Sequence, residues 1–211
     1  MLVFAFGTLV GLIGSSNNTL VGSQNMIQVS NDATILGRLD EVSDSNSETI
    51  IGDRINVKDS EFDTTIGKLH MIVDSDASTV IGTSHRVLQS ENCTVIGMNG
   101  HVNANNAVAI GSNLYVTQTS VVLGAYNSEL EGSVFAVGNG THEKRSNALS
   151  VMHNGSILVG NVDILRELHL LREEVIALRG EIASKNCADG ASCSELRRAY
   201  KSASCCTRRR R

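Results

Sequence analysis

Ten glycines recur through the first two thirds of this 211-residue chain at an almost constant spacing. The first six intervals are fifteen residues each, and the last three are fourteen, thirteen and fourteen residues. A unit this short cannot bury its own apolar side chains, so successive units must stack to build a shared core. The spacing therefore predicts a solenoid. The glycines are Gly7, Gly22, Gly37, Gly52, Gly67, Gly82, Gly97, Gly111, Gly124 and Gly138.

Each unit carries two short apolar runs separated by polar turns. The first run ends at the glycine, as in TIIG (49–52) and TVIG (79–82), and the second is centred five residues later, as at Val42 and Val57. Serine recurs eight residues after the glycine, as at Ser45 and Ser60. β-Branched runs joined by small polar residues are typical of short strands and tight bends. The pattern predicts a mainly β protein, a parallel β-roll solenoid of about fifteen residues per coil.

Side-chain alternation divides the first run between two faces of its strand. The residues one and three before each glycine share a face, and the residue two before it points the other way. We expect the residue directly before the glycine to fill the interior of the roll. The predicted roll core is Val21, Leu36, Ile51, Ile66, Ile81, Ile96, Ile110, Leu123 and Val137.

The opposite face, two residues before each glycine, is also largely apolar. On this phase it would expose an aliphatic ladder along the whole solenoid, and such a patch normally marks an interface. We therefore predict self-association through this ladder. The predicted interface residues in the repeats are Ile35, Ile50, Val80, Val95, Ala109 and Val122.

Several phrases of the chain resemble a known family. VAIGSN (108–113), VVLGAYNS (121–128) and VFAVGNG (134–140) resemble the head repeats of YadA-like trimeric autotransporter adhesins. KRSNALSVMHNGSILVG (144–160) resembles the segment that follows such repeats in adhesins and in phage or viral tail fibres. The resemblance covers about residues 1–182, although the earlier coils carry threonine and acids where the family often has alanine and glycine. It implies left-handed rolls, with three chains packed side by side.

A second apolar pattern follows the repeats. Its members are spaced four, three, four, three and four residues apart, with charged residues between them. This heptad pattern predicts a short trimeric coiled coil. The alternative is an amphipathic helix that folds back onto its own domain. The seam residues, also predicted to lie in the trimer interface, are Ile164, Leu168, Leu171, Val175, Leu178 and Ile182.

These patterns divide the chain into four segments. We expect head repeats over 1–143, a neck over 144–160, a coiled-coil stalk over 161–184 and a flexible tail rich in Cys and Arg over 185–211. The first fourteen residues are interpreted as an incomplete first coil, with an unusual signal peptide as the alternative. The tail cysteines lack zinc-type spacing. They are interpreted as free thiols, with cross-linking between chains or lipidation as alternatives.

Charge and motifs limit the function. Residues 1–160 hold fifteen acidic and seven basic residues, which argues against nucleic-acid binding through the head. No catalytic triad, phosphate loop or HExxH motif occurs, so we expect no enzyme, cofactor or metal site. His70 and His85 occupy equivalent positions in neighbouring coils. They are interpreted as surface residues, with a metal-binding or pH-sensing pair as the alternative.

The sequence thus predicts a homotrimeric fibre that attaches to a host-cell or matrix receptor. We expect it at the cell surface, outside the cell or on a virion, with no membrane anchor encoded. The alternatives are a purely structural virion or tail-fibre shaft and an ice- or surface-binding solenoid. The last is suggested by the threonine ladder Thr19, Thr34, Thr49, Thr64, Thr79 and Thr94. The expected orientation of the strands argues against ice binding, because these threonines would share a strand face with the predicted core residues.

Overall fold

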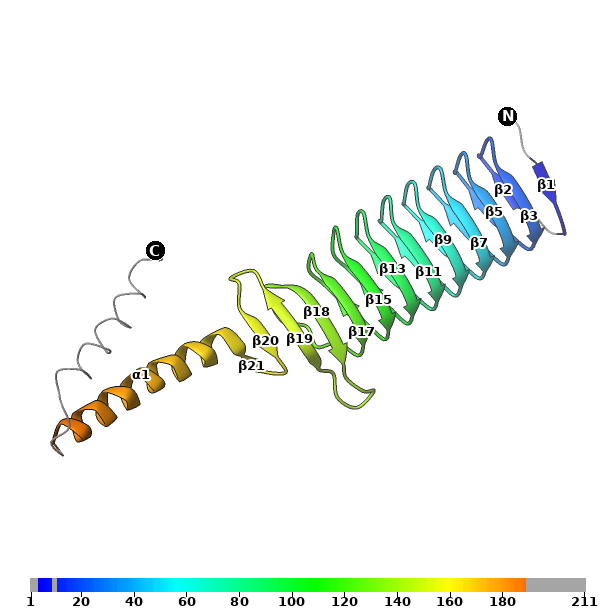
Figure 1. Cartoon of the computed structure of the whole chain (residues 1–211). Coiled ribbons are helices and arrows are strands. Elements are labelled where there is room, and N and C mark those ends of the chain that lie inside the picture. The colour runs from blue at the N-terminus through cyan, green and yellow to red at the C-terminus, as the bar shows by residue number, and fades with distance from the viewer. Residues whose placement is uncertain (1–3, 9–10, 189–211) are drawn as a thin grey trace. The chain divides into compact units, whose positions relative to one another are not determined.

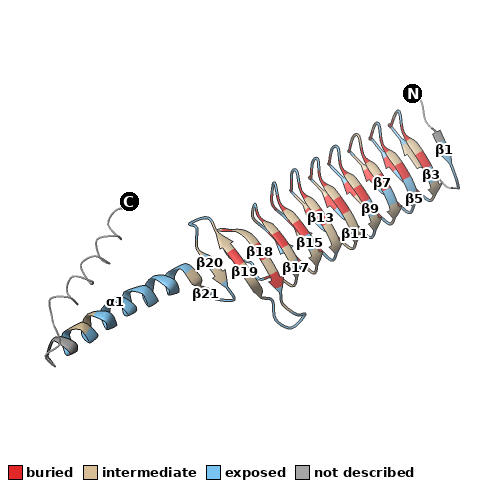
Figure 2. Cartoon of the chain, in the orientation of Figure 1, coloured by how far each residue is buried: buried red, intermediate tan, exposed pale blue. Residues whose placement is uncertain are grey.

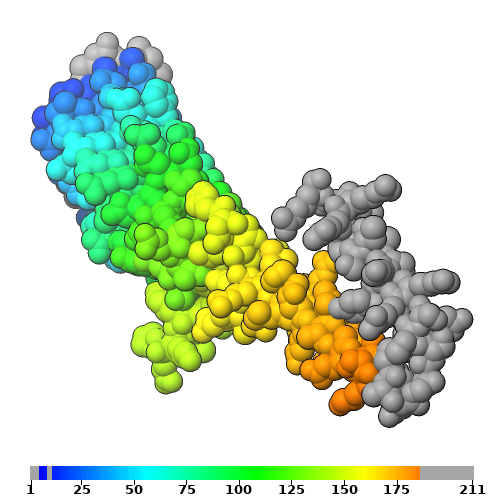
Figure 3. Space-filling model, turned by 90° about the vertical axis from the view of Figure 1, so that its left-hand side faces the viewer, coloured from blue at the N-terminus to red at the C-terminus, as the bar shows by residue number. Residues whose placement is uncertain are grey.

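The computed structural model describes residues 4–8 and 11–188, which fall into two compact units divided between Asn161 and Val162. The first unit is a parallel β-solenoid of about nine turns (Figure 1). Its coils follow one another in chain order, as the colour gradient of the space-filling view also shows (Figure 3). The predicted mainly β solenoid is confirmed.

Two sheets run along the first unit. The larger contains the strand that ends at or just after each repeat glycine, and it continues beyond the last repeat. Its strands in spatial order are β1 (Phe4–Phe6), β3 (Thr19–Ser23), β5 (Thr34–Arg38), β7 (Thr49–Asp53), β9 (Thr64–Lys68), β11 (Thr79–Thr83), β13 (Thr94–Met98), β15 (Val108–Ser112), β17 (Val121–Ala125), β18 (Ser133–Asn139), β19 (Asn147–Met152) and β20 (Ile157–Val159).

The smaller sheet holds the second apolar run of each coil. Its strands are β2 (Gly11–Ile13), β4 (Met26–Gln28), β6 (Glu41–Ser43), β8 (Asn56–Lys58), β10 (Met71–Val73), β12 (Arg86–Leu88), β14 (His101–Val102) and β16 (Tyr115–Val116). A third, shorter side is formed by single bridges from Ser16 to Glu91. Because β1 and β2 pair in register with β3 and β4, the described part of the first fourteen residues forms a coil, as predicted.

Equivalent residues of successive coils pair directly, and this register explains the repeated glycine. Val80 pairs with Val95, and Gly82 pairs with Gly97. A Cβ atom on Gly82 would overlap the carbonyl oxygen of Gly97, and its φ of +134° is one that side-chain-bearing residues rarely adopt. Only glycine satisfies both conditions.

Three corners close each fifteen-residue coil between Gly22 and Gly97, and each corner begins with a non-glycine residue in the left-handed region. In the coil that follows Gly37 these are Leu39 (φ +61°), Asp44 (φ +50°) and Ser47 (φ +64°). The residue after each corner is buried: Asp40, Ser45 and Glu48. The corner therefore turns the next side chain into the interior.

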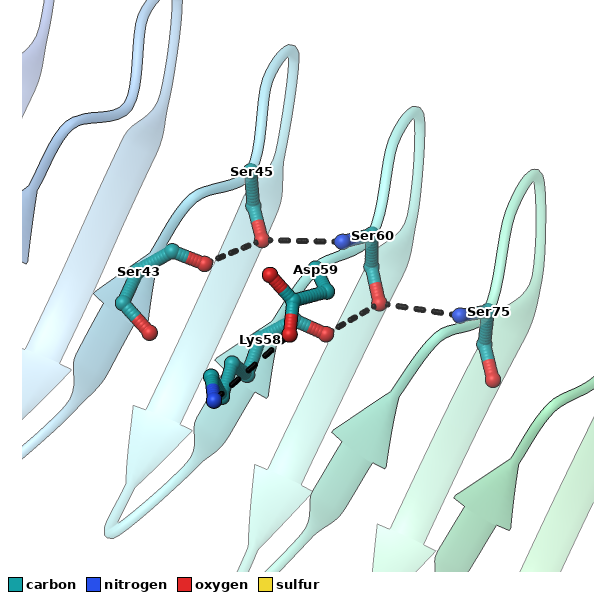
Figure 4. A network of polar contacts seen from close by, with 6 residues as sticks. All are labelled: Ser43, Ser45, Lys58, Asp59, Ser60 and Ser75. Atoms are coloured by element: carbon teal, nitrogen blue, oxygen red, sulfur yellow. Dashed lines mark hydrogen bonds and ion pairs between the residues drawn. The ribbon is translucent and has the colours of Figure 1, made fainter.

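Side chains that point inward from the corners bind the next coil. The Ser45 hydroxyl donates to the carbonyl of Ser43 and accepts the backbone N–H of Ser60, and the Ser60 hydroxyl repeats this with Lys58 and Ser75 (Figure 4). These serines are buried. The recurrent serine of the sequence is thus a column of hydrogen bonds that satisfies buried backbone N–H groups.

The prediction of which strand face lies inside the roll is wrong. The predicted interface residues Ile35, Ile50, Val80, Val95, Ala109 and Val122 are buried in the core, each with 4% or less of its surface exposed. The predicted core residues Val21, Leu36, Ile51, Ile66 and Ile110 are exposed, and Ile81, Ile96, Leu123 and Val137 are half-buried.

The corners explain this reversal. The third corner, which precedes the strand of the larger sheet, turns the residue four before the next glycine inward. Because side chains alternate along a strand, the residue two before that glycine also points inside. Val80 therefore joins Ile72 and Val87 of the smaller sheet in one hydrophobic core. The residues one and three before the glycine face outward. Figure 2 shows the buried part of the repeat strands as a red band that recurs from coil to coil.

The sheet changes direction after the last repeat. β17 and β18 are parallel, whereas β18, β19 and β20 pair antiparallel. The Arg145 guanidinium donates to the carbonyl oxygens of Asn113 (2.8 Å) and Asn127 (3.2 Å), and it lies over the Tyr126 ring. Arg145 thus fastens the segment before β19 to the last coils.

The second unit consists of β21 (Val162–Asp163) and helix α1 (Ile164–Ala188). The Asp163 carboxylate caps the helix by accepting the backbone N–H groups of Leu165 and Arg166, both at 3.1 Å. Glu167 in the first turn and Lys185 in the last oppose the helix dipole. The predicted helix over the heptad segment is confirmed.

Candidate functional site: the outer aliphatic stripe

One row of aliphatic side chains runs along the outside of the larger sheet. Every coil from Gly22 to Gly138 contributes the residue directly before its glycine. We call this row the outer stripe: Val21, Leu36, Ile51, Ile66, Ile81, Ile96, Ile110, Leu123 and Val137. With in-register strands about 4.8 Å apart, nine members extend for roughly 40 Å. An apolar row of this length is unusual on the surface of an isolated soluble protein.

The outer stripe continues past the change of strand direction. Val137 pairs with Leu149 in β19, and Leu149 pairs with Val159 in β20. Directly paired residues point to the same side of a sheet, so these two side chains extend the row. Leu149 is half-buried and Val159 is 53% exposed. The aliphatic row thus continues beyond the last glycine of the repeat.

From Gly22 to Gly82, polar columns border the outer stripe on both sides; in the next coil, Met98 follows the glycine and is 47% exposed. The threonine ladder lies two residues before it in each of six coils and is half-buried. On the other side, the Arg38 guanidinium binds the Asp53 carboxylate of the next coil at 3.0 Å. This hydrogen bond and charge lower the pKa of Asp53. The outward face is therefore an apolar centre with a polar rim, which is the usual anatomy of a protein interface.

A second apolar row lies on the described part of helix α1. The five later seam residues predicted from the heptads are all exposed, whereas Ile164 is half-buried. The exposed members are Leu168 (57%), Leu171 (55%), Val175 (44%), Leu178 (49%) and Ile182 (59%).

The two histidines are buried rather than on the surface. The backbone N–H of His85 donates to His70 Nδ1 (3.2 Å), and that of Gly100 donates to His85 Nδ1 (3.0 Å). The opposite ring nitrogens, Nε2, lie 3.3 and 3.2 Å from the carbonyl oxygens of Ile66 and Ile81. Each ring must therefore be the neutral Nε2–H tautomer. Both nitrogens of each ring are used, which leaves no lone pair for a metal.

Sequence reasoning missed three buried carboxyl groups, those of Asp40, Glu48 and Asp63. Asp40 lies three residues after its glycine, and the other two lie four residues before theirs. Their positions relative to the glycines match those of other buried corner residues, such as His70 and Ser78. This spacing was the available signal, but acidic residues are expected at turns on the surface.

Two features of the described residues bear on metal binding and on ligand binding. No group of three or more His, Cys, Asp or Glu side chains among them could hold a metal ion. A pocket beside β16, lined by Tyr115, Gln118 and Leu130 among others, has a volume of about 10 Å³, room for one water. No helix in the described segments is long and apolar enough to cross a membrane.

The structure describes the surroundings of Cys93 but not those of the cysteines near the C-terminus. Cys93 is buried, and burial raises the pKa of its thiol. Its Sγ donates to the carbonyl of Ala104 at 2.8 Å, so the thiol takes part in corner bonding. The cysteines at 193, 205 and 206 and the arginine run lie outside the described residues, and Cys187 lies in the last turn of α1.

Neither a family model nor a curated protein matches this chain. The class is therefore defined by the fold and the candidate site: a parallel β-solenoid repeat protein with an aliphatic row on its outer face, followed by a helix with an exposed heptad seam.

Proposed function

We propose that this protein is a non-enzymatic attachment fibre that works as a homotrimer. The solenoids associate through the outer stripe, and the helices associate through the seam from Leu168 to Ile182. The observation that carries the proposal is the uninterrupted outer stripe, which continues into β19 and β20. The outer stripe takes the place of the aliphatic row two residues before each glycine, which the sequence pattern predicted as the interface and which lies in the core.

Energetics favours covering both rows. Burying the remaining exposed surface of an aliphatic side chain contributes roughly 1 kcal/mol, and each chain offers one such residue per coil. Helices in proteins owe most of their stability to packing of an apolar face, and α1, with 25 residues, has its apolar seam exposed. Association stabilises both units without any change in their folds. The choice of three copies rests on the resemblance of residues 108–160 to trimeric adhesin heads.

The geometry of such a fibre supports a role in attachment. Each coil repeats the same backbone while its exposed turn residues vary, so the sides away from the outer stripe present an extended surface to a receptor on a cell or matrix. We place the protein at a cell surface, outside the cell or on a virion.

Sedimentation equilibrium of the full chain tests the assembly. A species of three times the 22.5 kDa chain mass is expected at micromolar concentration. A folded monomer would refute the proposal, and a dimer would correct the number of copies. Beads coated with the trimer should then be retained on cell or matrix layers, and beads coated with a folded monomeric variant should not.

A second candidate function is binding to an ordered flat surface such as ice. The observation that favours it is the threonine ladder, which faces outward beside the outer stripe rather than inward as first expected. Its members pair in register from Thr19 to Thr94. The two candidates require the same face, so a trimer would cover the ladder. Thermal hysteresis by a monomeric protein would favour the second, and its absence at high concentration would refute it.

A further inference from the structure

Unpartnered polar atoms are concentrated in one part of the solenoid. In the described segments, every buried side-chain oxygen without a hydrogen-bond partner belongs to a residue between positions 40 and 65. They are Asp40 Oδ2, Glu48 Oε1 and Oε2, Asp53 Oδ1, Asp63 Oδ2 and Thr65 Oγ1. The serine columns show that this fold can satisfy its buried groups, so this concentration requires an explanation.

Glu48 and Asp63 are the most enclosed of these groups. They occupy the same corner in successive coils, and each is 1% exposed. Neighbouring strands lie about 4.8 Å apart. Asp63 Oδ1 accepts the backbone N–H of Ser78 at 2.7 Å, whereas the other three oxygens of the pair have no well-formed hydrogen bond. The backbone N–H of Asp63 offsets only part of the effect of burial on the pKa of Glu48. Two ionised carboxylates in this position would repel each other without compensation.

The surrounding charges do not relieve this repulsion. Those that act on Glu48 are Asp63, Asp76 and Glu61, and Asp76 also acts on Asp63. The adjacent corner residues of the same column, Ala33 before the pair and Ser78 after it, carry no charge. In the interior column three residues after the glycines, burial raises the pKa of Asp40 to about 6 and lowers that of His70 to about 4.

We propose that Glu48 and Asp63 form a proton-holding pair, which keeps coils 45–67 closed while protonated and opens them when both groups ionise. The pair would make this stretch of the solenoid lose stability as pH rises. Opening exposes both carboxylates to water, which removes the cost of their charges.

The direction of the pH dependence follows from burial. Desolvation raises the pKa of Glu48 to about 9 and that of Asp63 to about 7. An acid whose pKa is higher in the folded state stabilises that state at low pH and loses this effect as pH rises toward the folded value. The closed state therefore binds more protons than the open state from the ordinary pKa of each group, 4.5 for Glu48 and 3.8 for Asp63, up to its raised value. The opening constant should rise by up to about tenfold per pH unit for each proton released.

Hydrogen exchange of the full assembled chain tests the pair, with each rate divided by the intrinsic rate at the same pH. Amides at Thr49, Ile50, Thr64 and Thr65 report the segment, and those at Val95 and Ile110 report coils without the pair. From about pH 6 to about pH 9, protection should fall at the first group by roughly a hundredfold or more, and at the second group it should stay nearly constant.

The chain itself supplies suitable variants. Ala33 and Asn18 occupy the corners equivalent to that of Glu48 in the two preceding coils. The Asn18 side chain accepts the backbone N–H of Ala33 at 2.9 Å. Glu48→Ala and Asp63→Asn therefore use residues that this column already accommodates. Asp74→Asn, at an exposed corner, is the matched control.

The pH dependence should become shallower in each single variant, disappear in the double variant and persist in Asp74→Asn. An unchanged pH dependence in the double variant would overturn the proposal. So would equal pH dependence at both groups of amides in the wild-type protein. A hydrogen-exchange result is independent of the number of chains, so failure here leaves the trimer proposal to its own test.

Discussion

The imidazole rings of His70 and His85 stack inside the solenoid, with their centroids 5.1 Å apart and their planes inclined by 6°. Each ring accepts a backbone N–H from the next coil, as Asn25 does at the same corner. The two histidines therefore act as neutral corner residues. Their buried position, rather than a bound ligand, determines how they respond to pH.

Acid should destabilise the coils that hold this stack. Burial lowers the pKa of His70 from 6.5 to about 4, so the folded state disfavours its protonation. Stability is complete above about pH 6.5 and should fall by up to roughly 3 kcal/mol as pH decreases toward about 4. His70→Asn keeps an acceptor for the His85 N–H and removes the titrating group. Thermal unfolding at several pH values should show a smaller acid loss in this variant, whereas His153→Asn, at an exposed position, should behave like the wild type.

A glycine that ends the aliphatic run of a coil should be far less replaceable than a glycine elsewhere in the solenoid. Gly82→Ala places a Cβ against the Gly97 carbonyl and requires an unfavourable φ, so we expect a loss of about 3 kcal/mol or more. Gly11→Ala is the control, because its Cβ would lie 3.8 Å from the nearest side-chain atom. Chemical denaturation should separate the two variants. Equal stability would mean that the glycine register is not needed for stacking.

Adjacent residues of β11 should give opposite phenotypes. Ile81→Asp places a charge on the outer stripe, so it should prevent association while the solenoid stays folded. Val80→Asp places an unpaired charge in the core and should cost several kcal/mol of folding stability. Sedimentation and circular dichroism together distinguish these outcomes. A trimeric Ile81→Asp protein with unchanged melting would remove the outer stripe from the interface.

The sequence predicted the solenoid, its period and the helix because glycine spacing and heptads are periodic signals. It did not predict which face of the larger sheet points into the roll, because both faces of a strand such as TIIG carry aliphatic residues. The deciding feature is the left-handed corner before Glu48, and residues such as Ser47 give no strong indication of that geometry. The buried carboxyls of Asp40, Glu48 and Asp63 were missed for the same reason. Once the corners are placed, strand alternation assigns every interior column.

The serine column should contribute measurably to stability. Ser60→Ala removes the acceptor for the buried Ser75 N–H and should cost about 1–3 kcal/mol. Ser43→Ala is a suitable control, because Ser43 enters the network in Figure 4 through its carbonyl group. Urea denaturation of both variants measures the difference. If Ser60→Ala left the free energy of unfolding unchanged, water would have to replace the hydroxyl at this corner.

Thr65 should be a site where a substitution stabilises the protein. It occupies a core position that is Ile50 in the preceding coil and Val80 in the following one, and its buried hydroxyl has no hydrogen-bond partner. Valine has nearly the same shape and removes the unsatisfied group, so Thr65→Val should increase stability by about 1–2 kcal/mol. Thr64→Val, on the outward face, should have little effect on the folding of one chain. If Thr65→Val lowered the unfolding midpoint instead, the hydroxyl would have to be hydrogen-bonded inside the roll.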